Sequence, residues 1–158
     1  MVTLRNFYSS NITKKYINWL KDKTITKHTS INSKLSYAQI KNYVKKHQNN
    51  KNQKLYRIFY KKKHVGNIRI CKKYKNEMTI GILIGEKKYQ NMSIGTKSIQ
   101  KLIKILKQEK IKTIIAYVSK KNKQSVKFFK KNNFCENNNV KYFLKIKRNT
   151  YSILKLNI

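Results

Sequence analysis

The sequence predicts an α+β fold in three layers, with helices flanking a mixed, mostly antiparallel central sheet. Short segments rich in β-branched and aromatic residues are interspersed with segments of helical apolar spacing. One strand–helix–strand unit has lengths that require a parallel pair of strands with a crossover helix. We therefore expect about six or seven strands and about four helices. A chain of 158 residues has the size of one domain, so we expect a single domain over residues 1–158.

The first half of the chain is predicted to contain four strands and two helices. Strands are expected at residues 2–7, 54–60, 64–71 and 76–85. An apolar stripe predicts a helix over residues 13–21. A second helix begins at Ser36, because Ser36 and Gln39 match a capping box. A polar loop is expected between these two helices, and a short basic turn makes 54–60 and 64–71 an antiparallel hairpin.

The second half supplies the crossover unit and a closing hairpin. Apolar residues spaced for burial predict a helix over 96–109, followed by a β-branched strand at 112–118. A further helix is expected at 122–131. Alternating residues around 142–146 and 151–156 predict a hairpin that closes the sheet.

The charge of the chain is extreme, with 39 Lys and Arg against 5 Asp and Glu and a formal net charge of +34. Such a charge suggests nucleic acid or another polyanion as a partner. The alternative is codon bias in an AT-rich genome, because Lys, Asn and Ile are overused throughout and Pro is absent. Both explanations stay open at this point.

The same composition excludes several classes of protein. Five scattered carboxylates are too few for paired-carboxylate hydrolysis or a carboxylate-rich metal site, and Cys71 and Cys135 lack zinc-site spacing, so no metal is expected. No apolar run approaches the roughly 18 residues of a membrane span. The N-terminus lacks the pattern of an export signal. We expect a cytoplasmic protein with reduced thiols and no contact with a membrane.

The segment from Gln90 to Thr96 lies between a predicted strand and a predicted helix, where backbone N–H groups can hold a phosphate. It resembles the pyrophosphate loop of the GNAT N-acetyltransferases, written Gln/Arg-x-x-Gly-x-Gly/Ala. Gln90 and Gly95 match this motif, and Ser93 replaces its first glycine. Serine is small, but it lacks glycine's free access to positive φ. The residues that the resemblance assigns to acetyl-CoA here are Gln90, Asn91, Met92, Ser93, Ile94, Gly95 and Thr96.

A second part of the resemblance follows the next strand, where Asn122 and Ser125 form an Asn-x-x-Ser pattern. Relatives end this helix with Lys-x-Gly-Phe, and here Asn133 takes the place of the glycine, as a residue that tolerates a left-handed C-cap. Asn122, Ser125 and Phe129 are thereby expected to contact the cofactor. Residues 17–20 and 65–68 resemble RimJ/RimL-like members, so the resemblance spans nearly the whole chain.

The resemblance also implies a mechanism in which an amine attacks the acetyl carbon directly. Two diverging strands, after Leu83 and around Tyr117, would hold the pantetheine arm like an extra strand, and a backbone amide of Ile82, Leu83 or Ile84 would polarise the thioester. Relatives often carry a glutamate where this chain has Thr79. Glu77, two residues earlier on the same face, is the candidate base, acting through water, and the alternative is a solvated carboxylate.

The usual thiolate-protonating tyrosine is replaced by Phe129, so Tyr117 or Tyr142 is the candidate acid, with water as the alternative. For the acceptor, the resemblance leaves a nucleotide-linked amino sugar, towards which we lean, or a protein N-terminus. The rival hypothesis is a protein that binds RNA or the ribosome without catalysis. For the acetyltransferase, contact with nucleic acid or the ribosome is possible but not required. The protein is expected to be a monomer or a homodimer.

Overall fold

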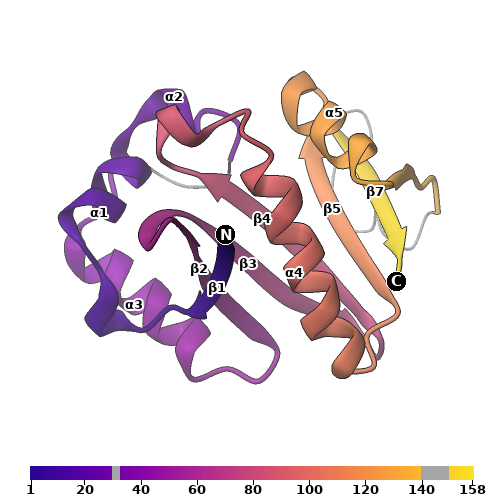
Figure 1. The fold of residues 1–158 in the computed structure, drawn as a ribbon, viewed down its shortest axis with the longest axis horizontal. Coiled ribbons are helices and arrows are strands. Elements are labelled where there is room, and N and C mark those ends of the chain that lie inside the picture. The colour runs from indigo at the N-terminus through magenta and orange to yellow at the C-terminus, as the bar shows by residue number, and fades with distance from the viewer. Residues whose placement is uncertain (30–32, 140–149) are drawn as a thin grey trace.

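The computed structural model describes residues 1–29, 33–139 and 150–158. Seven strands of this part of the chain form one sheet in the order β1-β2-β3-β4-β5-β7-β6 (Figure 1). All neighbouring strands are antiparallel except β4 and β5, which are parallel. The strands are β1 (Val2–Asn6), β2 (Gln53–Tyr60), β3 (Lys63–Tyr74), β4 (Glu77–Ile84), β5 (Thr113–Ser119), β6 (Cys135–Glu136) and β7 (Tyr151–Asn157). The predicted mixed, mostly antiparallel sheet is confirmed.

Five α-helices accompany the sheet in the described residues, one more than the four expected. They are α1 (Lys14–Lys21), α2 (Lys23–Thr26), α3 (Tyr37–Gln48), α4 (Ile94–Gln108) and α5 (Lys123–Lys131). The capping box of α3 is confirmed, since Gln39 N donates to Ser36 Oγ and Ser36 N donates to Gln39 Oε1. The prediction of a polar loop between α1 and α3 is wrong in one respect, because this segment contains the short helix α2. Asp22 ends α1 and also caps α2, accepting from Thr24 N at 2.8 Å.

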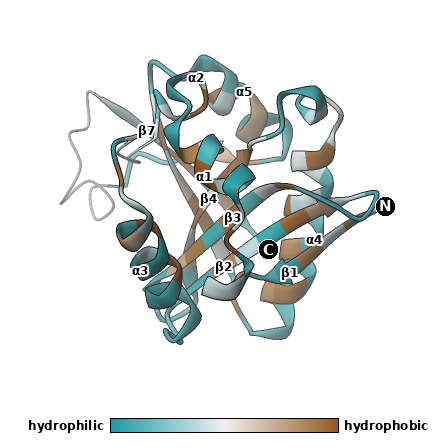
Figure 2. Ribbon diagram, turned by 90° about the vertical axis from the view of Figure 1, so that its left-hand side faces the viewer, coloured by the Kyte–Doolittle hydropathy of each residue, from teal (hydrophilic) through white to brown (hydrophobic). Residues whose placement is uncertain are grey.

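The helices cover both faces of the sheet, as Figure 2 shows with α3 on one side and α4 on the other. Alternation along β4 sends Ile80 and Ile82 towards the core beneath α4 and α5, whereas Leu83 joins the core beneath α1 and α3. The parallel pair β4–β5 is joined through α4, so the predicted crossover unit is confirmed. None of the helices described here is long and apolar enough to cross a membrane.

The C-terminal strand lies inside the sheet, between β5 and β6. Residues 151–157 form β7, as expected for 151–156, and pair with β5 over seven residues from Thr113–Asn157 to Ser119–Tyr151. On its other side β7 pairs with the two residues of β6. The segment 142–146, expected to be the partner strand of the hairpin, lies outside the described residues, and Tyr142 lies there too.

Helix α5 ends in a left-handed turn at Asn133, as its replacement of the family's glycine indicates. Asn133 has a φ of 65°, its N–H donates to Lys130 O, and the N–H of Phe134 donates to Phe129 O at 3.1 Å. These two bonds make a Schellman motif. The rings of Phe129 and Phe134 lie 5.0 Å apart and close the motif from the core side.

Candidate active site

The two central strands of the sheet separate along their length. β4 and β5 pair only from Glu77–Thr113 to Thr79–Ile115. Beyond this point β4 continues beside β3 as far as Ile84, while β5 continues beside β7 as far as Ser119. The separation therefore begins at Ile80, earlier than the expected position after Leu83. Among the described residues no strand pairs with the β5-facing edge of residues 80–84, so its backbone groups can receive an extended ligand.

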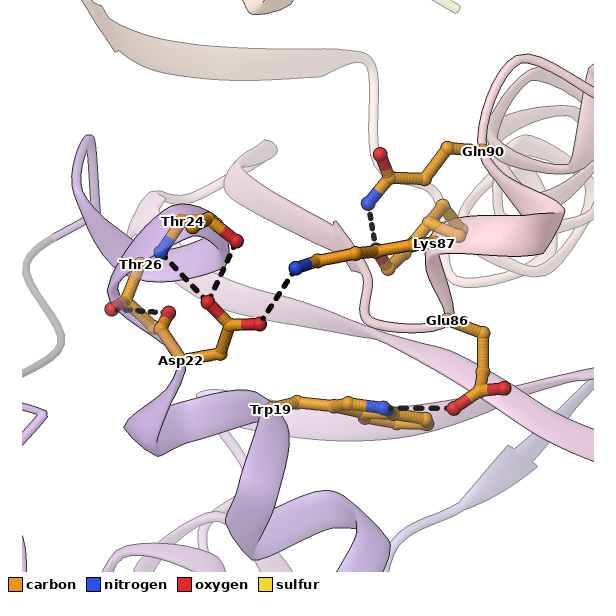
Figure 3. Close-up of polar contacts among 8 residues, drawn as sticks. Trp19, Asp22, Thr24, Thr26, Glu86, Lys87 and Gln90 are labelled. Carbon is orange, nitrogen blue, oxygen red and sulfur yellow. Dashed lines mark hydrogen bonds and ion pairs between the residues drawn. The ribbon is translucent and has the colours of Figure 1, made fainter.

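The segment after β4 leads directly from this gap into α4. Gln90 Nε2 donates to the carbonyl of Ile84 at 2.9 Å, which fixes the start of the segment to the end of β4 (Figure 3). Asn91 and Ser93 have φ angles of 60° and 55°, in the left-handed region. Met92 between them is 46% exposed. The loop therefore has the backbone shape that glycine would favour, although serine occupies the motif position.

Replacing Ser93 by glycine is expected to stabilise the protein. A left-handed conformation costs a non-glycine residue about 1–2 kcal/mol, and the greater freedom of glycine in the unfolded chain offsets part of this gain. We expect Ser93→Gly to raise the free energy of unfolding by about 0.5–1 kcal/mol in urea denaturation. Asn133→Gly should gain less, because asparagine tolerates this conformation. Loss of stability in Ser93→Gly would show that the Ser93 side chain has a role of its own.

The first turn of α4 has amide groups that no described side chain caps. Ser93, its N-cap, makes no side-chain hydrogen bond, and no acidic residue lies in the first turn. By contrast, Thr13, Ser36 and Asn122 cap α1, α3 and α5 with their own side chains. Unsatisfied N–H groups and the positive end of a helix dipole favour an anion. The chemistry of this turn fits the pyrophosphate of acetyl-CoA.

Gly95 allows α5 to approach this turn closely. A Cβ on Gly95 would lie 2.9 Å from Cε2 of Phe128, and Ile94 and Gly95 are both buried. Thr96 is partly exposed. Phe128 therefore borders the phosphate-binding turn, a position that the sequence reasoning missed. The sequence indicated this position only through the neighbouring aromatic residues 128 and 129. Such a pair does not predict which of the two rings faces the loop.

The other predicted cofactor residues lie around the same end of the sheet. Asn122 Oδ1 accepts from Ser125 N at 3.0 Å and caps α5. Ile82, Leu83 and Ile84 form the end of β4 beside the gap. Phe129 is only 5% exposed and packs in the core. Little of its surface is left for a ligand, so its contact with the cofactor stays a prediction.

The candidate catalytic residues share a face but lie apart. Because β4 and β5 are parallel and in register, Glu77 and Tyr117 both lie on the face opposite α4. Glu77 is at the closed end of the gap, and Tyr117 is four residues further along, about 13 Å in the strand direction. A direct contact of both with one reacting centre is therefore excluded. Thr79 is itself engaged, since its hydroxyl donates to the carbonyl of Cys71 at 3.2 Å.

His64 is a further titratable residue near this end of the sheet. Burial and the charge of Arg57 lower the pKa of His64 to about 4, so its ring is neutral at pH 7. The ring is packed against aromatic neighbours, with Trp19 at 5.0 Å and Phe59 at 5.6 Å between centroids, and its Nε2 is bonded to Gly66 O. We assign it to packing. In the described part of the chain, no three His, Cys, Asp or Glu side chains gather to hold a metal.

A group of polar contacts ties α1 and α2 to the turn before the cofactor loop (Figure 3). Trp19 Nε1 donates to Glu86 Oε1 at 3.1 Å, and Lys87 Nζ is 3.1 Å from Asp22 Oδ2. Hydrogen bonds from Thr24 and the contact with Lys87 lower the pKa of Asp22 to about 2. The Trp19 indole also lies directly on Gly85.

Beside these contacts is an open groove of about 590 Å³. Its lining comes from α1, α2 and the segment after β4, and consists of Lys14, Lys15, Asn18, Trp19, Asp22, Ile25, Gly85, Glu86, Lys87 and Lys88. Four lysines face two carboxylates there, and both carboxylates are paired with lysine. Sequence reasoning did not find this group, because its halves are more than 60 residues apart.

Solved structures of acetyltransferases share this fold. The PaiA N-acetyltransferase of Thermoplasma acidophilum in complex with coenzyme A has 16% identity and a TM-score of 0.78, with 100% of this chain and 99% of that chain covered. The spermidine N-acetyltransferase of Vibrio cholerae with coenzyme A and spermine has 14% identity and a TM-score of 0.82, covering 99% and 95%. The aminoglycoside acetyltransferase AAC(6')-Ib with coenzyme A and kanamycin has 14% identity and a TM-score of 0.80, also covering 99% and 95%. No curated protein sequence matches the chain.

A family model extends the finding from fold to family. Residues 2–135, well over half of the chain, match the model described as the acetyltransferase (GNAT) domain. This range includes the gap between β4 and β5, the loop from Gln90 to Thr96 and all of α5. The chain therefore belongs to the GNAT acetyltransferase family, and it is an N-acetyltransferase that uses acetyl-CoA.

Proposed function

We propose that this protein acetylates the primary amine of an anionic acceptor, specifically a nucleotide-linked amino sugar, and that residues 1–158 act as one domain. The observation that carries the acetyl transfer is the gap between β4 and β5, which opens towards the uncapped first turn of α4. The choice of acceptor is supported by charge. The structures with spermine or kanamycin hold polycationic amines. A chain of net charge +34 repels such molecules and attracts anionic ones.

The carboxylates of this chain add to the charge argument. Within the described residues, four of them pair with lysines, as Lys15–Glu86, Lys54–Glu109, Lys87–Asp22 and Lys130–Glu136. An acceptor with several ammonium groups would have to compete with these lysines for a carboxylate. An acceptor with phosphates would instead find a surface in which cations greatly outnumber anions. The balance of charge therefore favours the anionic acceptor.

In the proposed mechanism the chain positions two substrates, and two protons are transferred. Acetyl-CoA supplies the acetyl thioester, whose C–S bond breaks as the amine nitrogen bonds to the acetyl carbon. The segment from Gln90 to Thr96 holds the pyrophosphate, and Asn122 and Ser125 flank it from α5. The amides of residues 82–84 hold the pantetheine arm and polarise the carbonyl. Tyr117, which lies level with Gly81, returns a proton to the thiolate, and the amine proton leaves to water, because Glu77 lies about 16 Å or more from residues 82–84.

Calorimetry with acetyl-CoA tests the proposed function against RNA binding. We expect acetyl-CoA to saturate the protein at one molecule per chain at moderate salt, and a screen of amines with detection of the released thiol to select the nucleotide-linked amino sugar. A non-catalytic RNA-binding protein would not bind acetyl-CoA, and its affinity for RNA would fall linearly with salt in a log–log plot. If the protein acetylated peptide N-termini and not the sugar, the acceptor would be a protein N-terminus, and the proposed acetyl transfer would still hold.

A further inference from the structure

Arg69 lies one strand away from the gap, on the face of the sheet away from α4. It is an exposed residue of β3 that pairs directly with Gly81 of β4. Its Nε lies 4.0 Å from the position that a Cβ would take on Gly81, so the side chain lies over the backbone of β4. Gly81 immediately precedes residues 82–84, which hold the thioester in the proposed mechanism. The guanidinium is therefore within about 3–10 Å of that segment in the strand direction.

The groups around Arg69 leave it able to bind an anion. On the side of α3 it contacts Tyr43, whose pKa is raised by burial, an effect that the charge and hydrogen bond of Arg69 oppose. His47, in the next turn of α3, has its pKa lowered by burial and by Arg69, so it is neutral at pH 7. Arg69 has five N–H donors, and one bond to a tyrosine leaves most of them available.

Among the other charged residues of this face, Arg57 of β2 pairs with Asn67, which itself pairs with Leu83, and two more lie further along the strands. Lys73 lies over the ring of Tyr117, with 5.8 Å between its Nζ and the ring centroid. Glu77 is four residues from Gly81 along β4, about 13 Å. Between Arg69 and the open end of the gap, β4 contributes only Gly81 to Ile84, none of which is charged. The face beside the thioester segment is therefore cationic.

We propose that Arg69 binds the phosphate of the acceptor and so determines its specificity for anionic amines. This inference rests on the proposed function. An acceptor approaching from this face would place its amine in the gap and its phosphate on the guanidinium, whose planar fork matches phosphate oxygens in pairs. Acetyl-CoA, held by the Gln90–Thr96 loop and α5 on the other face, does not need Arg69.

Three acceptors and three variants test the assignment. Calorimetry in the presence of coenzyme A measures the affinity for a nucleoside diphosphate-linked amino sugar, the same amino sugar unlinked, and spermidine. Arg69→Gln is expected to weaken the linked sugar about 10- to 100-fold while leaving the unlinked sugar and acetyl-CoA unchanged. Arg69→Lys should be intermediate, because lysine keeps the charge but not the fork. Lys72→Gln is the matched control, because Lys72 lies in the same strand three residues after Arg69 and on the opposite face of the sheet. This variant removes one positive charge as well, and it should change the affinity for the linked sugar less than about twofold.

Several outcomes would overturn the assignment. Equal losses of affinity in Arg69→Gln and Lys72→Gln would mean that only the net charge matters. An equal loss of affinity for the linked and the unlinked sugar would mean that Arg69 supports the structure of the site and does not bind the phosphate. Failure of the unaltered protein to bind the linked sugar, or tighter binding of spermidine, would also overturn it. In each of these cases one-to-one binding of acetyl-CoA would still support the proposed reaction, so the two failures are distinguishable.

Discussion

Gly95→Glu is expected to abolish binding of acetyl-CoA. Gly95 is buried in the first turn of α4, whose N-cap makes no side-chain bond and whose amides face the anion site. A glutamate there would place a carboxylate among the amides that hold the pyrophosphate. Repulsion between like charges about 4 Å apart near a protein surface is about 4 kcal/mol, so we expect at least a 100-fold loss in affinity by calorimetry.

The variant also introduces a steric change that must be separated from the charge. A Cβ at this position would lie 2.9 Å from Cε2 of Phe128, so even alanine requires the ring to move. Gly95→Ala is the control for this movement, and Gly95→Gln has the length of glutamate without its charge. Both should retain more affinity than Gly95→Glu, with thermal melting used to verify that all three are folded. If Gly95→Glu bound acetyl-CoA as well as the unaltered protein does, the loop would not be the pyrophosphate site.

Gly85→Ala is expected to destabilise the fold by about 3 kcal/mol. The added Cβ would lie 2.1 Å from Cδ2 of Trp19, well inside the contact distance of two carbon atoms, and two further indole atoms would be within 2.6 Å. The indole cannot move freely, because it is 4% exposed, packs in the core of α1 and α3, and donates to Glu86. Overpacking of this kind typically costs about 1–3 kcal/mol, and the lost hydrogen bond to a carboxylate adds to it.

Urea denaturation measures this loss, and Gly81 supplies the matched control. Gly81 lies in β4, four residues before Gly85, but a Cβ there would meet only Arg69 Nε at 4.0 Å, an ordinary contact. Gly81→Ala should therefore change the free energy of unfolding by less than about 1 kcal/mol. In the double variant Gly85→Ala with Trp19→Ala, the two losses should be clearly less than additive. Full additivity would mean that the indole and Gly85 do not constrain each other.

The sequence predicted those features that are set by nearby residues. The capping box at Ser36 and the left-handed turn at Asn133 follow from contacts within a few positions, and both are confirmed. The β4–α4–β5 crossover follows from the lengths and apolar spacing of consecutive segments, which also specify a parallel pair. At Ser93 the motif indicated the backbone shape correctly even though the residue type does not favour it.

Features that depend on tertiary contacts were missed. Helix α2 has four residues without an apolar stripe, and it forms because Asp22 caps it. The bond between Trp19 and Glu86 joins residues 67 positions apart, and no periodicity predicts it. The orientation of the pair Phe128 and Phe129 depends on how α5 packs, which places the second ring in the core and the first beside Gly95. The composition likewise predicted the net charge, but it could not predict how the charged side chains are arranged around Arg69.

The separation of β4 from β5 leaves a strand edge in the middle of the sheet that no strand of residues 1–29, 33–139 or 150–158 pairs with. An edge of this kind is a template on which a second chain can add a strand, and it is a known starting point for aggregation. Residues 80–84 are apolar and carry no proline or charge to discourage such pairing. Mutual repulsion between copies of net charge +34 keeps two such edges apart in dilute salt. The excess of lysine thus protects the colloidal stability of a protein whose sheet must stay open to do its chemistry.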